Sequence, residues 1–228
     1  PLDFQGTEEE QIMFTSNGQG MGIALINCGA ESKFEFVVFN KLKNPSYNNL
    51  SFEGVLNFYK SDFKLIYCQI TNNQSPAALK VVESAFVISG CVIKDISADI
   101  FNFNSSAGTI ANCIFMNCAG NGITLDGSSA ELFNSTFNSI GNIGLNVGKS
   151  AAVKASQIRI TGSKMAVLSK DLSEIYILNS LIEKCIVGIE AVQQSNQFGP
   201  SSVAIAQTKI NEVQNPFMAD AVSMLIVD

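Results

Sequence analysis

The chain has 228 residues, of which 46% are apolar and only 15% charged, so it can bury a large core and is too apolar for a disordered protein. Its net charge of −6 argues against binding to the phosphate backbone of nucleic acids, which requires clustered Lys and Arg, and against electrostatic attachment to anionic lipid. No apolar run approaches the roughly 18 residues of a membrane-spanning helix, so we expect neither a nucleic-acid partner nor insertion into a membrane.

The first fifty residues contain apolar strands but no regular repeat. Two segments, 23–26 and 34–39, have the composition of buried strands. Phe39 and the next equivalent apolar position, Ile70, are 31 residues apart, so KLKNPSYNNLS (41–51) is expected to form a loop. We therefore expect residues 1–51 to form irregular N-terminal turns of the fold.

From Ile70 onward an apolar residue recurs at steps of 22 or 23 residues, with a last step of 28. The positions are Ile70, Ile93, Phe115, Phe137, Ile160, Ile182 and Ile210. A second series lies two residues earlier: Cys68, Cys91, Cys113, Ser135, Ile158, Ser180 and Thr208. One residue earlier still, Asn recurs at Asn112, Asn134 and Asn179. A period of this length indicates a repeat protein in which each repeat is one supersecondary unit.

Within each repeat, apolar residues are spaced by two, which is the period of a β-strand. Residues 66–70 read as a first strand, 79–81 as a second, and a third strand such as 130–132 leads into the next repeat. Short strands without helical connections stack in parallel if the chain coils, with like residues about 4.8 Å apart. We therefore predict an all-β, single-stranded parallel β-helix (a solenoid) of about ten rungs, each rung being one turn of about 22 residues. Its Asn series would form a side-chain ladder at one bend.

Residues 52–228 form the regular part of the predicted solenoid, apart from an insertion, QQSNQFGPSS (193–202), that accounts for the step of 28. No domain boundary is evident, so we expect residues 1–228 to form a single domain. Residues 224–227 begin a further strand and no capping helix is evident, which predicts an open strand edge, caused by truncation or covered by another subunit.

The rungs with the pattern Asn-Cys-x-Phe-x-Asn and Gly-Ile-x-Leu resemble the repeats of right-handed parallel β-helices, the pectin-lyase-like superfamily, from about Phe52 to Val213. More narrowly, FEGVLNFYKSD (52–62), LSKDLS (168–173) and FGPSS (198–202) are similar to β-helix domains found beside CotH-kinase-like domains in bacterial surface or secreted proteins. The chain is poorer in Asp and Lys than that group. The resemblance implies a right-handed coil and an extracellular or cell-surface location.

The resemblance also implies which residues an enzyme of this superfamily would need. Lyases of the superfamily use clustered Asp and Glu to hold Ca²⁺, with an Arg or Lys base, and the hydrolases use paired aspartates with a His and an Arg-x-Lys motif. This chain has no His and a single Arg, Arg159, with no acidic pair beside it in register. We therefore predict no catalytic residue, no cofactor and no metal ligand. If the chain is an enzyme, we expect a polysaccharide lyase or glycoside hydrolase.

Acidic residues at the predicted turns have two interpretations. Asp95, Asp99 and Asp126 could gather around Ca²⁺, which prefers oxygen ligands, or could be separate turn-forming residues in solvent. We favour the second interpretation. The pair Lys170–Asp171 also lies at a predicted turn and is interpreted as a solvated ion pair.

The six cysteines, at positions 28, 68, 91, 113, 118 and 185, include no CxxC motif, which excludes thioredoxin-like and zinc-ribbon sites. Cys68, Cys91 and Cys113 share one inward series and are interpreted as small buried hydrophobes. A disulfide between neighbours in a parallel stack is geometrically awkward, although disulfides that involve Cys118 or Cys28 remain an alternative.

Apolar residues at outward positions indicate a candidate interface. Val92 and Ile114 are adjacent and apolar in the first strand, although a solvent-facing sheet normally alternates apolar and polar residues. Leu168, Val82 and Val192 are also expected to face outward. A covering segment or loop is the alternative explanation. The candidate interface residues are Val92, Ile114, Leu181, Leu225 and Ile226.

These features lead to two main hypotheses about function. The first is a non-catalytic structural or adhesive β-helix module of a secreted or cell-surface protein that self-associates into a homo-oligomer, an extracellular assembly or a filament. The alternative is a polysaccharide-binding or polysaccharide-degrading β-helix protein. Trp is absent and there are four Tyr, so platforms for stacking sugars are scarce. A stiff spacer within a longer chain is a third interpretation.

Overall fold

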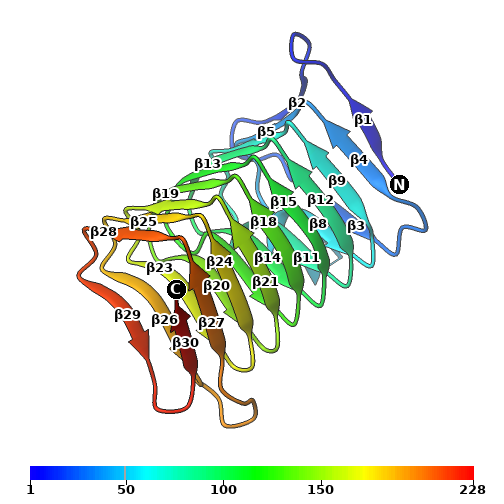
Figure 1. The fold of residues 1–228 in the computed structure, drawn as a ribbon. Coiled ribbons are helices and arrows are strands. Elements are labelled where there is room, and N and C mark those ends of the chain that lie inside the picture. Colours follow the sequence, from blue (N-terminus) through cyan, green and yellow to red (C-terminus); the bar gives the residue numbers. More distant parts are fainter. Residues whose placement is uncertain (49) are drawn as a thin grey trace.

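The computed structural model describes residues 1–48 and 50–228, and in these residues the chain winds into a parallel β-helix with three sheets (Figure 1). Nine rungs contribute one strand to each sheet, the last rung contributes β30 (Met224–Val227) to one sheet only, and no helix occurs in the described residues. An apolar helix of membrane-spanning length is accordingly not found in that part of the chain. The largest sheet has ten strands, one from each rung, which confirms the predicted fold.

The three sheets are defined here by their strands in spatial order. Sheet 1 contains β1 (Asp3–Gln5), β4 (Ser32–Glu35), β9 (Phe63–Ile66), β12 (Ala85–Ser89), β15 (Ala107–Ala111), β18 (Ser129–Phe133), β21 (Ala152–Ser156), β24 (Glu174–Leu178), β27 (Ser202–Ala206) and β30 (Met224–Val227). Sheet 2 contains β2 (Ile12–Thr15), β5 (Val37–Asn40), β10 (Gln69–Thr71), β13 (Val92–Ile96), β16 (Ile114–Cys118), β19 (Thr136–Ile140), β22 (Arg159–Thr161), β25 (Leu181–Glu183) and β28 (Lys209–Asn211). Sheet 3 contains β3 (Ile23–Ile26), β8 (Gly54–Tyr59), β11 (Ala77–Val82), β14 (Asp99–Asn104), β17 (Ile123–Asp126), β20 (Ile143–Gly148), β23 (Met165–Lys170), β26 (Val187–Val192) and β29 (Asn215–Ala219).

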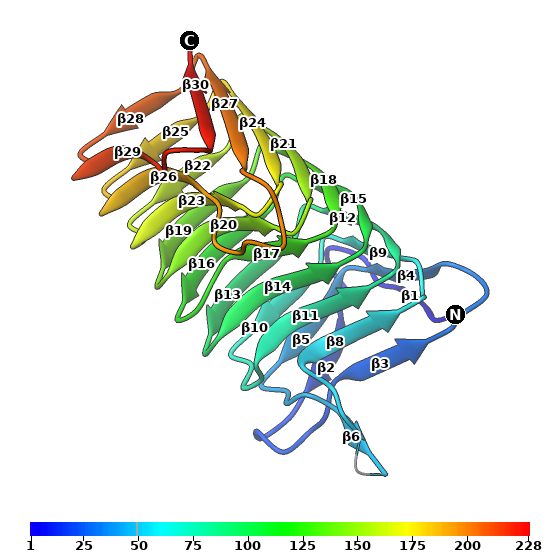
Figure 2. The same ribbon diagram turned by 90° about the horizontal axis from the view of Figure 1, so that it is seen from below.

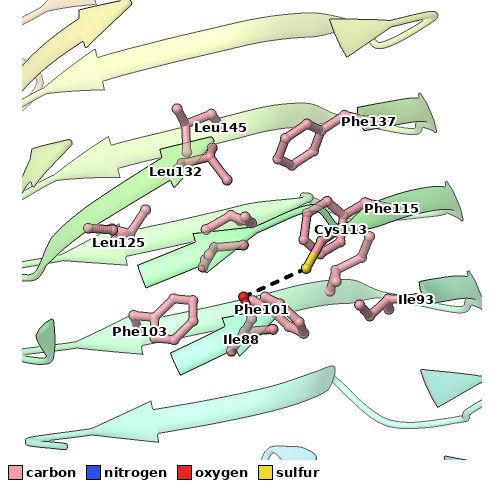
Figure 3. Close-up of a cluster of buried hydrophobic side chains, with 14 of the residues drawn as sticks. Ile88, Ile93, Phe101, Phe103, Cys113, Phe115, Leu125, Leu132, Phe137 and Leu145 are labelled. Carbon is pink, nitrogen blue, oxygen red and sulfur yellow. Dashed lines mark hydrogen bonds between the residues drawn. The ribbon is translucent and has the colours of Figure 1, made fainter. Parts of the chain in front are cut away.

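The register between rungs is the one that the repeat predicts. Ile70 pairs with Ile93, Ile93 with Phe115, and the series continues through adjacent strands of sheet 2 to Ile210. Figure 3 shows Ile93, Phe115 and Phe137 one above another in the core, and the ring centroids of Phe115 and Phe137 are 4.7 Å apart. Burial of these stacked apolar side chains is the main force that holds successive rungs together.

The first rungs continue the same three sheets, with longer connections. Phe14 pairs with Phe39 in sheet 2, and Phe39 pairs with Ile70 across the predicted loop. That loop carries a small antiparallel hairpin, β6 (Ser46–Tyr47) and β7 (Leu50–Ser51), which projects from the coil in Figure 2. The irregularity expected for residues 1–51 therefore lies in the connections, while the strands keep their pairing.

Bends between the sheets are made by single residues in the left-handed conformation, with φ between 46° and 69°. Asn and Gly adopt this conformation most readily. The bend after sheet 1 uses Phe36, Tyr67, Gly90, Asn112, Asn134, Gln157, Asn179 and Gln207. The bend after sheet 2 uses Lys41, Asn72, Asp95, Asn117, Ser139, Gly162, Lys184 and Glu212. Of the predicted Asn ladder, one step is present: Asn134 Nδ2 donates to Asn112 Oδ1 at 2.7 Å, and Gln157 then separates Asn134 from Asn179.

A buried hydroxyl follows the left-handed residue at many of these bends and links each rung to the next. After sheet 3, Ser61 N–H donates to Ser84 Oγ at 2.9 Å, and Ser84 Oγ donates to Val82 O at 2.9 Å. Ser84 N–H donates in turn to Ser106 Oγ at 3.2 Å. One small side chain therefore satisfies a buried N–H of the previous rung and a carbonyl of its own rung.

Three cysteines occupy this hydroxyl position after sheet 1. Cys68 N–H donates to Cys91 Sγ at 3.4 Å, and the Cys91 thiol donates to a main-chain carbonyl, either Ser89 O or Leu65 O. In the next rungs Cys113 N–H donates to Ser135 Oγ at 3.1 Å. All six cysteines are free, and five of them are buried. The interpretation as buried residues is confirmed, but their hydrogen bonds show that they are more than apolar filling.

Burial makes two of the buried thiols poor nucleophiles, whereas a side-chain hydrogen bond with Cys91 lowers the pKa of Cys68 and that of Cys113. Loss of solvent raises the pKa of Cys118 to about 12 and raises the pKa of Cys91. Because the thiolate is the reactive form, neither side chain is suited to redox or nucleophilic chemistry at neutral pH.

The insertion between β26 and β27 is an ordered loop, and it corrects the interpretation of Lys170–Asp171. Asp171 is buried rather than solvated, and its Oδ1 accepts hydrogen bonds from Gln194 N–H at 2.8 Å and Ser195 N–H at 2.7 Å. The carboxylate of Asp171 therefore anchors the inserted loop to the coil. Leu168 was also expected to be exposed, but only 4% of its surface is accessible between Asn146 and Glu190 of the neighbouring strands.

Candidate binding groove

The five candidate interface residues lie in three places. Val92 and Ile114 are neighbours on the outer face of sheet 2, where Ile114 is 40% exposed and Val92 is partly buried. Leu181 lies on the same face but is separated from Ile114 by Thr136 and Arg159.

The two C-terminal candidates lie on opposite faces of β30. Leu225 pairs with Val203 and packs against the core. Ile226 is 50% exposed on the outer face of sheet 1. The structure therefore brings Val92 and Ile114 together and places the other three residues elsewhere.

A groove of about 550 Å³ runs along the outer face of sheet 1, from Gly108 on β15 to Met224 on β30. It crosses six strands of the sheet, so its length is about 24 Å at a strand spacing of about 4.8 Å. Its long axis is parallel to the axis of the coil, because strands of one sheet stack along that axis (Figure 1).

Small side chains at the beginning of most strands make the groove hollow, and Glu174 is the exception. The first outward positions of successive strands are Ala107, Ser129, Ala152, Glu174 and Ser202. The next outward positions, two residues later, include the large side chains of Glu131, Lys154 and Tyr176. Alternation along the strand places both series on the same face, so the small residues form a floor and the large ones a wall.

Gly108 at one end of the groove has a structural role. A Cβ at this position would lie 2.0 Å from the carbonyl oxygen of Phe86 and 2.6 Å from its ring. Glycine therefore lets β15 approach the buried Phe86 closely.

The wall of the groove has charged side chains without partners. Glu131 is opposite Lys154 in register, and Lys154 is opposite Tyr176. Six ion pairs are found among the described residues, and none of them involves Glu131, Lys154 or Glu174. Tyr176 is 43% exposed. A second hollow of about 250 Å³, lined by Phe133 and Leu178, lies on the other side of the same wall, so the polar groups are accessible from both sides.

The two glutamates of the groove do not have the close spacing of the carboxyl pair of a retaining glycosidase. Glu131 and Glu174 are on strands separated by β21 and occupy different outward positions. Two strand spacings separate their backbones by about 9.5 Å, which is wider than the roughly 5 to 5.5 Å between the carboxyl groups of retaining glycosidases and at the upper end of the roughly 6.5 to 9.5 Å of inverting ones. The arrangement supplies hydrogen-bond acceptors, one cation and an aromatic ring along a path, which is suited to binding a long ligand.

The three turn aspartates lie apart and have separate partners. Asp95 Oδ1 accepts a hydrogen bond from Asn117 Nδ2, Asp99 Oδ1 accepts one from Asn121 N–H, and Asp126 forms an ion pair with Lys149. Within the ranges 1–48 and 50–228, no three His, Cys, Asp or Glu side chains gather in a way that could hold a metal ion.

Sequence reasoning missed this groove because it followed the outward series through all repeats for the first strand only and did not do so for the third strand. The signal is present in the third strand, where segments such as 129–133, 152–156 and 174–178 alternate between core residues and a mixed outward series. Two aligned series, one small and one large and polar, were readable from the repeat.

Comparison with known proteins assigns the class of the fold. The family described as "Right handed beta helix region" matches residues 12–164, and the chain belongs to this family. No curated protein sequence is significantly similar to the chain.

Several solved structures align with the chain at low similarity. The catalytic domain of a GH87 α-1,3-glucanase in complex with nigerose aligns with 97% of this chain and 62% of its own, at 10% identity and a TM-score of 0.40. The chain thus spans about three fifths of that domain. The Streptococcus pneumoniae surface protein and adhesin PfbA aligns over 99% of this chain and 88% of its own, at 9% identity and a TM-score of 0.27. The A-module of the Azotobacter vinelandii mannuronan C-5 epimerase AlgE4 covers 99% of this chain and 83% of its own, at 11% identity and a TM-score of 0.26.

Proposed function

We propose that this β-helix is a non-catalytic adhesive module of a secreted or cell-surface protein, and that it binds an extended polysaccharide along the groove of sheet 1. The observation that carries the proposal is the row of unpaired side chains, Glu131, Lys154 and Tyr176, on three adjacent strands in the middle of the groove. Because polysaccharides are encountered outside cells, this ligand fits the expected extracellular or cell-surface location.

The shape of the site favours a polymer recognised by side chains. The groove lies on the face of the sheet, where the main-chain groups of the strands are already paired with neighbouring strands. A peptide that recognises a sheet by adding a strand needs a free edge. Carboxylates accept hydrogen bonds from sugar hydroxyls, and the ring of Tyr176 offers an apolar face with a polar tip.

Replacement of Tyr176 tests the site. Tyr176→Ala should weaken binding to polysaccharide by about two- to tenfold, since aromatic contacts contribute about 0.5 to 1.5 kcal/mol beyond burial. Tyr67→Ala is the matched control, because Tyr67 is similarly exposed but lies at the bend after sheet 1, outside the groove. Binding can be measured by affinity electrophoresis in gels that contain single polysaccharides. Equal effects of the two substitutions would place the ligand elsewhere, and no binding across a broad panel would refute the function.

The same panel distinguishes an adhesive module from an enzyme. We expect no release of reducing or unsaturated sugars during long incubation with any polysaccharide that binds. Release that is lost in Glu131→Gln or Glu174→Gln would instead support the alternative, a polysaccharide lyase or glycoside hydrolase.

Self-association is a second part of the proposal, supported by the adjacent apolar residues Val92 and Ile114 on sheet 2. Ile114→Lys should shift an oligomer or filament towards monomer in size-exclusion chromatography with light scattering. Thr136→Lys, at the next position of the same outward series, is the control. A wild-type chain that remains monomeric at high concentration would refute association through this face.

A further inference from the structure

The charged residues of the groove favour a positively charged ligand. Its lining residues include two carboxylates, Glu131 and Glu174, and a single cation, Lys154. Neither carboxylate has a side-chain hydrogen bond or an ion pair in the described chain, although six other carboxylates are paired with Lys or Arg. The excess of negative charge in the groove agrees in sign with the net charge of −6 on the whole chain.

From this arrangement we propose that the groove selects a polysaccharide that carries free amino groups, such as a chain of de-N-acetylated hexosamines. The inference rests on the proposed function and specifies its ligand. An ammonium group on the sugar pairs with a carboxylate at the wall, while the sugar ring lies against Tyr176 and the small residues of the floor. Charge complementarity of this kind contributes more to specificity than to affinity.

The spacing of the carboxylates agrees with a repeating cationic ligand better than with a single cation. Glu131 and Glu174 lie two strands apart along the groove, with Lys154 on the strand between them. A single small cation would require both carboxylates at one point, whereas a polymer lying along the axis of the coil can place one ammonium group at each. Lys154 occupies the intervening strand and repels a cationic ligand there.

Lys154 has the opposite charge to the two glutamates, so the proposal predicts opposite effects on affinity when their charges are removed. With an amino polysaccharide, Glu131→Gln and Glu174→Gln should each weaken binding about two- to fivefold, the range typical of exposed charge pairs. Lys154→Gln should strengthen binding by a similar factor, because it removes a repulsive charge. All three effects should diminish as salt is added, since exposed charges are screened. An acidic polysaccharide would give the opposite signs throughout.

The experiment uses the whole chain and two oligosaccharides that differ only in the group on the sugar nitrogen, a neutral acetamide in one and an ammonium in the other. Fully N-acetylated and fully de-N-acetylated β-1,4-glucosamine hexamers are titrated by calorimetry into wild type, the three charge variants and a control, Lys164→Gln, whose residue is not among those that line the groove. Tighter binding of the de-acetylated hexamer, with weakening by both Glu variants and strengthening by Lys154→Gln, supports the proposal.

Other results overturn it in distinguishable ways. Equal or tighter binding of the acetylated hexamer, or of a polyuronate, would refute the amino-sugar specificity and leave the polysaccharide-binding function intact. Failure of every polysaccharide to bind would refute both. Tighter binding of an oligolysine of equal charge than of the de-acetylated hexamer would refute the polysaccharide and favour a basic peptide. Circular dichroism of each variant confirms folding, which is expected because the three side chains have no partners in the structure.

Discussion

The hydrogen bonds of the Cys91 thiol lead to a prediction that separates a polar from an apolar role for the cysteine column. Cys91 Sγ accepts the buried N–H of Cys68 at 3.4 Å and donates to a main-chain carbonyl within 3.4 Å. Cys91→Ser and Cys91→Ala both remove the sulfur, and they differ from each other by one hydroxyl. The serine variant can make the same two hydrogen bonds, as Ser135 does with Cys113 N–H in the same column.

The expected magnitude follows from the group that the alanine variant leaves without a partner. An unsatisfied buried donor costs about 1 to 3 kcal/mol, and Cys68 and Cys91 are each only 1% exposed, so water does not easily replace the lost partner. We therefore expect Cys91→Ser to have a free energy of unfolding about 1 to 3 kcal/mol higher than that of Cys91→Ala. A purely apolar site would give the reverse order, because a buried hydroxyl is costly unless it is bonded.

Equilibrium denaturation in urea, followed by circular dichroism, measures this difference. Because a solenoid can unfold in segments, hydrogen exchange of the Cys68 amide provides a local measurement beside the global one. That amide should exchange faster in Cys91→Ala than in Cys91→Ser. If the alanine variant is as stable as the serine variant and protects the Cys68 amide equally, the thiol is an apolar filler and the hydrogen-bond argument is wrong.

Three further predictions concern the core, one glycine and the inserted loop. Phe115→Ala should lower the free energy of unfolding by about 3 to 5 kcal/mol, whereas Phe133→Ala, whose ring is 37% exposed, should lower it by less than about 1 kcal/mol in the same urea titration. Gly108→Ala should lower the thermal midpoint more than Gly29→Ala, because the Cβ at position 108 would meet the Phe86 carbonyl at 2.0 Å while that at position 29 would have nothing within 4 Å. Main-chain N–H groups, first that of Gln193 and then that of Ser223, lower the pKa of Asp220 from 3.8 to about 2. The contribution of Asp220 to stability is therefore present above about pH 4 and lost as pH falls towards 2, so the protection of the Gln193 amide, relative to its intrinsic exchange rate at each pH, should decrease over that interval in wild type and change little in Asp220→Asn.

The repeat determined most of the fold in advance because burial acts on a periodic series of residues. Positions such as Ile70 and Phe115 must face the core in every rung, and this constraint fixes register as well as strand position. The bends were harder to predict. Left-handed residues after sheet 1 include Asn112 and Asn134, and Asn commonly adopts this conformation. Tyr67 and Phe36 adopt it too, because the fold imposes it.

Interactions between non-repeated segments were outside the reach of the repeat. Asp171 occupies a bend position like that of any solvated turn residue, and its burial depends on an insertion more than twenty residues later whose N–H groups it accepts. The same limitation applies to Leu168, whose outward position is correctly placed by the alternation but whose burial is not. A period predicts which way a side chain points and does not predict what covers it.

The separation of inward and outward series also explains why the groove can be specialised without affecting the coil. Sequence in the inward positions is constrained by stacking, and in the bend positions by hydrogen bonds such as that between Ser84 and Ser61. Glu131 and Glu174 contribute to neither constraint, and they have no partner that would stabilise them in the folded chain. Because Glu131 and Glu174 lie two strands apart and form no ion pair, the fold does not require either carboxylate, whereas a cationic ligand along the groove would pair with both.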